Sequence, residues 1–483
     1  MTDLEATIPG ATGSAAAVFR NRPFLLLWLS QLATQVGGNM VLYGLTVLVF
    51  DETGSTSAVS LLILTFLVPA VLFSALAGVY VDRFDRRKVL VSTNLIRAGL
   101  FLLLAFLDTN MLVLYTLNIA ISIATTFFAP AELSMIPRVV PRSQLTAANG
   151  IFLLTLNAAF ALGFALLGPL LVILAGPTIL IGVVAGLYLV AAGFCWTLPS
   201  APPGAMVHEG AVHEAEEAAG TFVEQLREGI AYVRANPVVS WSLLYLGVAA
   251  SIVGVLGVLG PAFAQDVLGL RTQDFVIIVA PLGLGAVIGA LGVNAVQGQV
   301  PRRRLIETGL VVLGICLALI SIAGPIAQFL RDVDDRVPGP DMSAFVSIIS
   351  VVVAIALVAG IAYTATAIPA QTELQEEIPP TVRGRVFGIL NMLVSVGSFL
   401  PIILVGYISD RVGTMPVLLG ASVLILVVGV ASLLARTSPP PGSLSDETPV
   451  EPGDAPPPGA PDGSSTAGSA DALAVPAPSP DEP

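Results

Sequence analysis

Charged residues crowd one short stretch between two long apolar segments. Six of the seven positions from 82 to 88 are charged: Asp82, Arg83, Asp85, Arg86, Arg87 and Lys88. Side chains of both signs at this density can form ion pairs, and an aspartate can also cap the N-terminus of a helix. A general preference for basic residues at one membrane face would explain the arginines but not the two aspartates. The two aspartates therefore need a further explanation.

Polar residues also recur inside apolar segments, where they could bind a ligand. Four of them are spaced four residues apart near the N-terminus: Gln31, Gln35, Asn39 and Tyr43. This spacing predicts that they lie along one helix face. Facing a cavity, they would hydrogen-bond an amphiphilic cargo; the alternative is hydrogen bonding between helices, worth about 0.6 kcal/mol per bond on average. The same alternatives apply to Asn157, Tyr363 and Asn391.

Ionisable residues inside the apolar segments are candidates for coupling transport to protons. Arg97 lies eight residues into a predicted span, which is about 12 Å deep at roughly 1.5 Å per residue. It could extend its charge to the surface or serve a cavity, because charges inside a membrane are functional by default. Glu132 and Glu373 fall near the inner ends of their spans. These three residues and Asp82 are the candidate coupling residues.

The cysteines and histidines give no sign of a metal site. Cys195 and Cys316 lie inside apolar segments and are expected in the core. His208 and His213 lie in an acidic stretch at a poor spacing for a metal pair on one helix face. We predict no metal and no cofactor. The ATP-binding loop G-x-x-x-x-G-K-[ST] is also missing, so we expect a non-enzyme driven by a gradient, either of an ion or of the cargo itself.

Composition places all these residues in a membrane protein. Of the 483 residues 55% are hydrophobic and 11% charged, and the mean hydropathy is +0.89; a soluble domain usually has about 25% charged residues. The net charge of −12 is concentrated in the stretch 199–237 and the C-terminal tail, which leaves no basic face for a nucleic acid. No signal-peptide pattern opens the chain, so we expect the first apolar stretch to stay in the mature protein.

Twelve apolar runs are long enough to cross a bilayer, which takes about 20 residues. None alternates polar and apolar residues as barrel strands do, so we predict an all-α integral membrane protein. The predicted spans are 23–49, 58–80, 89–107, 111–131, 147–171, 177–198, 238–263, 275–296, 305–327, 343–369, 385–407 and 416–435. With both termini in the cytoplasm, 16 of the 21 basic residues fall on the cytoplasmic side, which is the bias that orients membrane proteins.

An internal repeat divides the chain into two parts. The segments "PAELSMIPRVVP" (130–141) and "PAQTELQEEIPP" (369–380) share their first two residues and the closing proline, 239 positions apart. Two six-helix halves related as parallel repeats fit this pattern. The predicted parts are a cytoplasmic segment 1–22, a first half 23–198, a cytoplasmic linker with an amphipathic helix 199–237, a second half 238–436 and a disordered acidic, proline-rich tail 437–483.

The charged stretch also carries a resemblance to a known family. Together with a nearby glycine it fits the signature loop G-x-x-x-D-R-x-x-R-R of the major facilitator superfamily, in the expected place, through Gly78, Asp82, Arg83, Arg86 and Arg87. The segments "FRNRPFLLLWLSQLATQVGGNM", "PRVVPRSQLTAANGIF" and "EIPPTVRGRVFGIL" resemble a branch of bacterial exporters of macrolides, other drugs and siderophores. The resemblance extends to about residue 435.

The resemblance implies that the charged loop is a conformational switch. Gly78 would let neighbouring helices approach closely. Asp82 would cap the start of the eleventh span near 383–386, where the helix dipole favours an anion. Arg86 would pair with Glu132 at the inner end of the fourth span. Such a latch would join the halves when the transporter is open outward and release them when it is open inward.

The resemblance also bears on cargo and coupling. It implies that the first span lines a central cavity, which favours cargo binding by its polar stripe. Gly168 and Pro169 resemble the core of a motif associated with antiporters, in incomplete form. Relatives often carry acids where this sequence has Asn39 and Asn94, and an amide cannot take up a proton. The family thus implies proton antiport, and these two residues weaken it.

We therefore predict a multi-pass secondary transporter of the bacterial plasma membrane that exports amphiphilic drug-like or siderophore-like molecules by alternating access. Its expected partners are that small molecule, protons and the lipid bilayer, and we expect a monomer. Two alternatives stay open. One is a facilitator, or a lipid or metabolite transporter, without ion coupling. The other is a membrane receptor or scaffold that no longer transports, motivated by the acidic tail.

Overall fold

The computed structural model describes residues 15–107, 110–202, 227, 230–231, 233–296, 299–334, 343–377 and 383–434. Within these ranges every regular element is a helix, which confirms the predicted all-α class. The helices belong to one compact unit that ends at Ala435. The predicted tail 437–483 and most of the predicted linker helix lie outside the described residues.

The helices of the predicted first half cover its six spans. They are α1 (Ala15–Phe19), α2 (Arg22–Thr53), α3 (Thr56–Arg83), α4 (Arg86–Phe106), α5 (Met111–Val139), α6 (Leu145–Phe160), α7 (Gly168–Ala175) and α8 (Pro177–Trp196). A short 3₁₀ turn (Arg142–Gln144) precedes α6, and a π-helical segment (Ala161–Leu167) joins α6 to α7. The fifth span is thus one continuous run whose hydrogen bonding changes register in its middle, a feature often found at functional sites.

The helices of the predicted second half follow the same order. They are α10 (Pro237–Ala262), α11 (Val276–Ala295), α12 (Arg302–Asp334), α13 (Ser343–Glu377), α14 (Arg383–Val412) and α15 (Thr414–Leu434). A π-helical segment (Phe263–Val267) and a 3₁₀ turn (Thr272–Phe275) connect α10 to α11. Each of the twelve predicted spans therefore coincides with a helix or a helical run.

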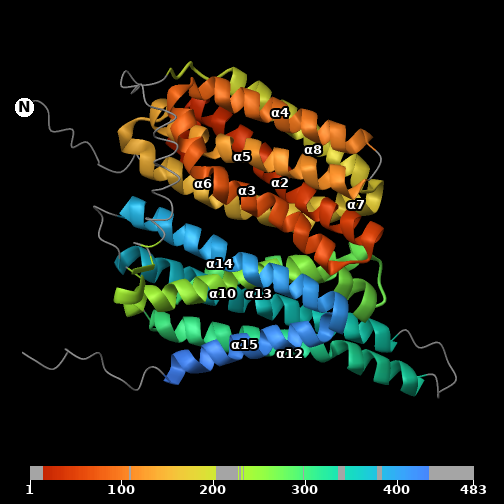
Figure 1. The fold of residues 1–483 in the computed structure, drawn as a ribbon. Coiled ribbons are helices and arrows are strands. Elements are labelled where there is room, and N and C mark those ends of the chain that lie inside the picture. The colour runs from red at the N-terminus through yellow and green to blue at the C-terminus, as the bar shows by residue number, and fades with distance from the viewer. Residues whose placement is uncertain are drawn as a thin grey trace, which may run out of the picture. The chain divides into compact units, whose positions relative to one another are not determined.

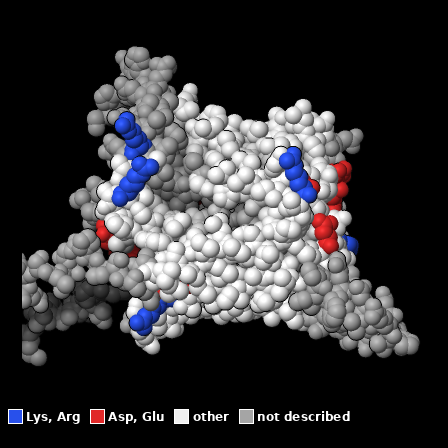
Figure 2. Space-filling model, turned by 60° about the horizontal axis from the view of Figure 1, so that its bottom comes forward, with Lys and Arg blue, Asp and Glu red and all other residues white. Residues whose placement is uncertain are grey.

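The surface of these helices suits a bilayer. Among the described residues, eleven helical runs are long and apolar enough to cross a membrane. Large apolar side chains face outward along them, including Phe106 at 84% exposure and Leu174 at 73%. On the face shown in Figure 2, the charged side chains of the described residues lie toward two opposite ends, with an uncharged band between them. Apolar side chains therefore cover the outside of the helices as well as the core, as expected for a surface in contact with lipid.

In the first half, α8 packs against both α2 and α4, and α5 packs against α3 and α4. In the second half α13 packs against α11 and α12, and α12 against α15. Between the two sets, α3 lies against α14 (Figure 1). We call the end of the bundle with the α2–α3 and α14–α15 turns the Asp410 end, and the end with the α3–α4 turn the Asp82 end.

Candidate binding cavity and charged loop

A cavity of about 250 Å³ lies inside the first half, between α2, α3, α4, α5 and α8. Most of its wall is apolar, with Phe66, Phe101 and Phe128 as its largest apolar side chains. The polar side chains in the wall are Thr34, Gln35, Asn39, Arg97, Asn118, Thr125, Glu132 and Tyr188. An apolar pocket with a few convergent polar groups is the usual form of a small-molecule site. We call it the first-half cavity.

Arg97 is held in the cavity wall by aromatic rings. Its side chain is only 2% exposed, and its guanidinium carbon lies 4.4 Å from the ring centroid of Phe128 and 4.6 Å from that of Tyr188. It donates a hydrogen bond of 2.6 Å to the Asn94 side-chain oxygen. Stacking on ring faces stabilises a desolvated guanidinium. Of the two alternatives open from the sequence, the geometry favours service to the cavity over extension to the surface.

Glu132 lies in the same cavity wall, 5% exposed, and interacts electrostatically with Arg97. Its Oε1 atom has no hydrogen-bond partner among the described residues. The family resemblance implies Arg86 as its partner. In this structure the Arg86 guanidinium instead donates to Asp82, at 3.1 Å, and to the Pro202 carbonyl. A buried carboxylate oxygen without a partner is costly unless a ligand, a proton or a water satisfies it.

The polar stripe of α2 does not share one environment, which corrects the prediction of a single cavity face. Gln35 and Asn39 line the first-half cavity. Gln31 is buried outside it and donates to the Phe152 carbonyl. Tyr43, at the other end of the stripe, also lies outside the cavity. The reason is geometric, because four residues turn a helix by one turn and about 40° more, so three such steps turn the stripe by about 120°.

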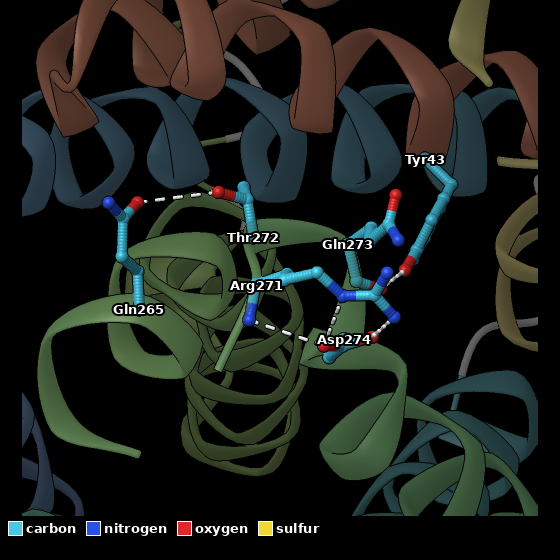
Figure 3. Close-up of polar contacts among 6 residues, drawn as sticks. All are labelled: Tyr43, Gln265, Arg271, Thr272, Gln273 and Asp274. Carbon is cyan, nitrogen blue, oxygen red and sulfur yellow. Dashed lines mark hydrogen bonds and ion pairs between the residues drawn. The ribbon is translucent and has the colours of Figure 1, made fainter. Parts of the chain in front are cut away.

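Tyr43 contacts the second half of the chain. Its hydroxyl donates to the carbonyl of Gln273 in the segment between α10 and α11, and its ring stacks on Phe275 with centroids 4.5 Å apart (Figure 3). The same segment is stiffened by an ion pair between Arg271 and Asp274, at 3.1 Å (Figure 3). Tyr43 is therefore part of a contact between the halves, at the Asp410 end.

The other predicted cargo residues are placed less fully. Tyr363 is half-buried in α13 and is not part of the first-half cavity. The side chains of Asn157 and Asn391 lie outside what the structure describes. Asn118, which was not among the predicted site residues, lines the cavity and donates to the Thr65 hydroxyl at 2.9 Å. The signal was available, because Asn118 is an amide in the middle of an apolar span.

The charged loop is anchored to the segment that follows α8. Asp85 caps α4 by accepting from the Arg87 backbone N–H at 2.9 Å, and it also accepts from Ser200 and the Ala201 N–H. Burial raises the pKa of Asp85, but the hydrogen bonds, that from Ser200 first, outweigh burial and hold the pKa below its ordinary value. Arg87 donates to the Leu198 carbonyl at 3.2 Å. The loop thus fixes where the linker leaves the bundle.

Of the predicted latch residues, Asp82 is exposed in this structure. The Asp82 side chain is 74% exposed and bonds to Arg86 on the neighbouring helix. A Cβ atom added at Gly78 would meet nothing within 4 Å among the described residues.

Two further predicted positions have structural partners. Glu373 is in α13, apart from the first-half cavity, and accepts from Ser242 at 3.4 Å.

Gly168 follows the π-helical segment, and a Cβ there would lie 2.8 Å from the Gly163 carbonyl and 3.1 Å from the Tyr43 Cβ. Glycine at this kink therefore allows close packing of the fifth span on α2, with Pro169 ending the π-helical hydrogen bonding.

Comparison with known proteins agrees with this picture. The family model described as Major Facilitator Superfamily matches residues 27–401. A protein named multidrug efflux pump Tap from Mycolicibacterium fortuitum is 22% identical, covering 85% of this chain and 95% of its own. Macrolide efflux protein A from Streptococcus pyogenes is also 22% identical, covering 84% of this chain and 94% of its own.

Solved structures share the fold at low identity. A bacterial homologue of the human lysosomal transporter Spinster, in an inward-facing and unoccupied conformation, superposes with a TM-score of 0.64 at 15% identity, covering 87% of this chain and 97% of its own. The nucleoside transporter NupG superposes with a TM-score of 0.62 at 14% identity, covering 86% of this chain and 99% of its own.

Proposed function

The chain belongs to the major facilitator superfamily, and we propose that it exports amphiphilic small molecules across a bacterial plasma membrane by alternating access. It acts as a monomer with both termini in the cytoplasm, so that the Asp82 end faces the cytoplasm and the Asp410 end faces outward. The loop charges of the sequence support this orientation, and the efflux names of its relatives support the direction of transport.

The observation that carries the proposal is the first-half cavity. Its apolar wall would contact the apolar part of a cargo, while Gln35 and Asn39 would form hydrogen bonds with a polar group of the cargo. Phe66, Phe101 and Phe128 would add ring contacts. A cavity with this division suits an amphiphile better than a sugar or a small ion, whose surfaces are polar throughout.

Coupling to protons is the finer part of the proposal, and Glu132 would carry it. Its unpartnered oxygen can accept either a proton or a donor group of the cargo, and it lies in the same wall as Arg97. Cargo binding and protonation would then compete for one carboxylate, which is the arrangement that exchange of one for the other requires. Asp82 and Glu373 lie outside this cavity.

The test is drug accumulation in a bacterial host that lacks its own pumps. We would measure uptake of fluorescent dyes, macrolides and tetracyclines with and without a protonophore. The expected result is lower accumulation, abolished by the protonophore and by Glu132→Gln. A matched control, Glu52→Gln, changes an exposed carboxylate at the end of α2 and should transport normally. Unchanged accumulation across the panel would contradict the proposal.

An uncoupled facilitator remains the second candidate, favoured by Asn39, an amide in the cavity wall where an acid would carry a proton. It is distinguished by the same assay, because its transport would be insensitive to the protonophore and to Glu132→Gln when cargo flows down its gradient. The receptor or scaffold alternative is separated by deleting residues 437–483. A transporter should still move cargo after this deletion, whereas a scaffold should lose its partner.

A further inference from the structure

The chain contains a second copy of the charged motif, at the opposite end of the bundle. Residues 406–411 in α14 repeat the pattern G-x-x-x-D-R that residues 78–83 form in α3. Each copy lies at the C-terminal end of its helix. Because the start of α3 contacts the end of α14, the two packed helices run in opposite directions and their copies lie at opposite ends (Figure 1).

The copy in α14 is docked on the first turn of α3. The Asp410 carboxylate accepts from the backbone N–H groups of Thr56 at 2.7 Å and Ser57 at 3.0 Å. It also accepts from the hydroxyls of Ser55 at 2.7 Å and Thr56 at 2.6 Å. The first N–H groups of a helix have no partner within it, and the helix dipole favours an anion there. Asp410 therefore caps a helix that lies more than 350 positions away.

Gly406 makes the contact close enough for this capping. A Cβ atom at Gly406 would lie 2.1 Å from the Ser60 hydroxyl and 2.8 Å from the Thr56 carbonyl. The Thr56 hydroxyl oxygen also lies 2.9 Å from the Gly406 carbonyl oxygen, so its one hydrogen is shared between this carbonyl and Asp410. The Ser60 hydroxyl donates to the Ile402 carbonyl one turn earlier, also at 2.9 Å. Only glycine fits at this crossing, so the glycine and the aspartate of the motif serve one contact.

The copy in α3 does not show this docking among the described residues. Asp82 is 74% exposed and pairs within its own loop, and Gly78 has open space around it in the described part of the chain. The two copies have the same pattern but different environments, because Asp410 is docked on the partner helix whereas Asp82 is exposed and paired with Arg86. A pair of rigid helices that tilts to close one end opens the other, so simultaneous docking of both copies would need the helices to bend.

We propose that Asp410 is the gate residue of the outward-facing end, and that Asp82 and Asp410 dock alternately on α14 and α3. Docking of Asp410 closes the Asp410 end, as in this structure, and docking of Asp82 closes the Asp82 end. Asp410 thus acts as a positioning residue for the conformational cycle and does not contact the cargo. The inference rests on the alternating access of the proposed function.

The test measures the two ends of the bundle directly. Spin labels would be attached at Leu112→Cys in α5 and Val412→Cys in α14, both exposed side chains at the Asp410 end. The native cysteines, Cys195 and Cys316, are buried and should not be labelled. Distances would be measured by pulsed electron paramagnetic resonance on the full chain in lipid nanodiscs. The labelled protein that keeps Asp410 and Asp82 should give mainly the short distance, which corresponds to a closed Asp410 end.

The gate variants should move this distance in opposite directions. Asp410→Asn should raise the ratio of long to short distances roughly tenfold, the scale expected when charge-assisted bonds to a helix N-terminus are lost. Asp82→Asn should leave the end closed or close it further. Asp51→Asn, an exposed aspartate at the same end, is the matched control and should change nothing. Thr56→Ala, which removes one hydroxyl donor, should open the gate by a smaller factor.

The proposal is overturned if Asp410→Asn and Thr56→Ala both keep the closed distance, or if Asp82→Asn opens the Asp410 end as much as Asp410→Asn does. Since the measured quantity is a distance, a chain that moves no cargo would refute the proposed function and leave this result standing. Conversely, active export with an unmoved gate would refute only the role of Asp410.

Discussion

The guanidinium of Arg97 lies 4.6 Å from the ring centroid of Tyr188, in the wall of the first-half cavity. The Arg97 charge is removed from water in this position. Glu132, which is also buried, carries the opposite charge with which it interacts. Removing either charge leaves the other without compensation in an apolar interior. The stability of the first half should therefore depend on the two residues as a unit.

A double-mutant cycle tests this dependence. At a pH at which Glu132 is ionised, Arg97→Gln and Glu132→Gln should each lower stability by roughly 3 to 5 kcal/mol, because each leaves a buried uncompensated charge. The double variant should be less destabilised than the sum of the two, with a coupling of at least about 1 kcal/mol. The measurement is denaturant-induced or heat-induced unfolding of the purified protein in detergent.

An exposed arginine–glutamate pair in the second half provides the control for that cycle. Arg302 and Glu376 form an ion pair with side chains 38% and 59% exposed. Because water screens such pairs, the corresponding Gln variants should be close to neutral and additive. Additive effects for Arg97 and Glu132 as well would show that the two charges do not compensate each other.

Asp82→Asn tests the charged loop in transport. The substitution keeps the size of the side chain and removes the charge that would dock on the start of α14. We expect transport to fall by roughly tenfold while the protein stays folded and inserted, since Asp82 is exposed here and supports no core packing. Initial export rates normalised to the amount of protein in the membrane would check this, and normal export would remove the latch from the mechanism.

The spans were predictable because a bilayer leaves a simple signature in the sequence. A helix needs about 20 apolar residues to cross it, and α8 and α15 match their predicted spans closely. The cavity was predictable only in part. Gln35 and Asn39 line it, but the 40° rotation per four residues carries Gln31 and Tyr43 elsewhere.

The partners of the charged groups could not be predicted, for a different reason. Asp82 pairs with Arg86 in this structure, whereas the proposed latch would dock it on α14 in a different conformation, and one sequence can support both arrangements. The cap that Asp410 places on α3 joins segments more than 350 residues apart. The motif itself is visible in the sequence at 406–411, but its target appears only when the two helices are packed together.

Gly163→Ala tests the packing of the fifth span on the first. A Cβ at Gly163 would lie 2.5 Å from the Val36 carbonyl and 2.8 Å from the Asn39 Cβ, so two backbones must separate. Overpacking of this kind costs about 1 to 3 kcal/mol, and it should also disturb Asn39 in the cavity wall. Gly186→Ala in α8 is the control, because its Cβ would meet nothing within 4 Å among the described residues. Equal unfolding midpoints for the two variants would contradict this close contact.

The pH dependence of the closed end follows from Asp410, which lies beyond the predicted span 385–407. Burial raises its pKa, but the hydrogen bonds from Ser57, Thr56 and Ser55 outweigh burial and lower the pKa from its ordinary value to about 2. The docked carboxylate thus binds protons less readily than the free one. Docking is fully favoured above the ordinary pKa, near 4, and is lost as the pH falls toward 2.

We therefore expect the distance between labels at Leu112→Cys and Val412→Cys to stay short from about pH 8 to about pH 5, and to lengthen only between about pH 4 and pH 2. Arg411, the neighbouring charge, stacks on Tyr407, with its guanidinium carbon 3.9 Å from the ring centroid. Asp410→Asn should abolish the acid transition, with circular dichroism confirming that the helices remain folded. A gate that opened between about pH 8 and pH 5 would show that a group other than Asp410 controls it, because a carboxylate with a lowered pKa holds its charge over that whole interval.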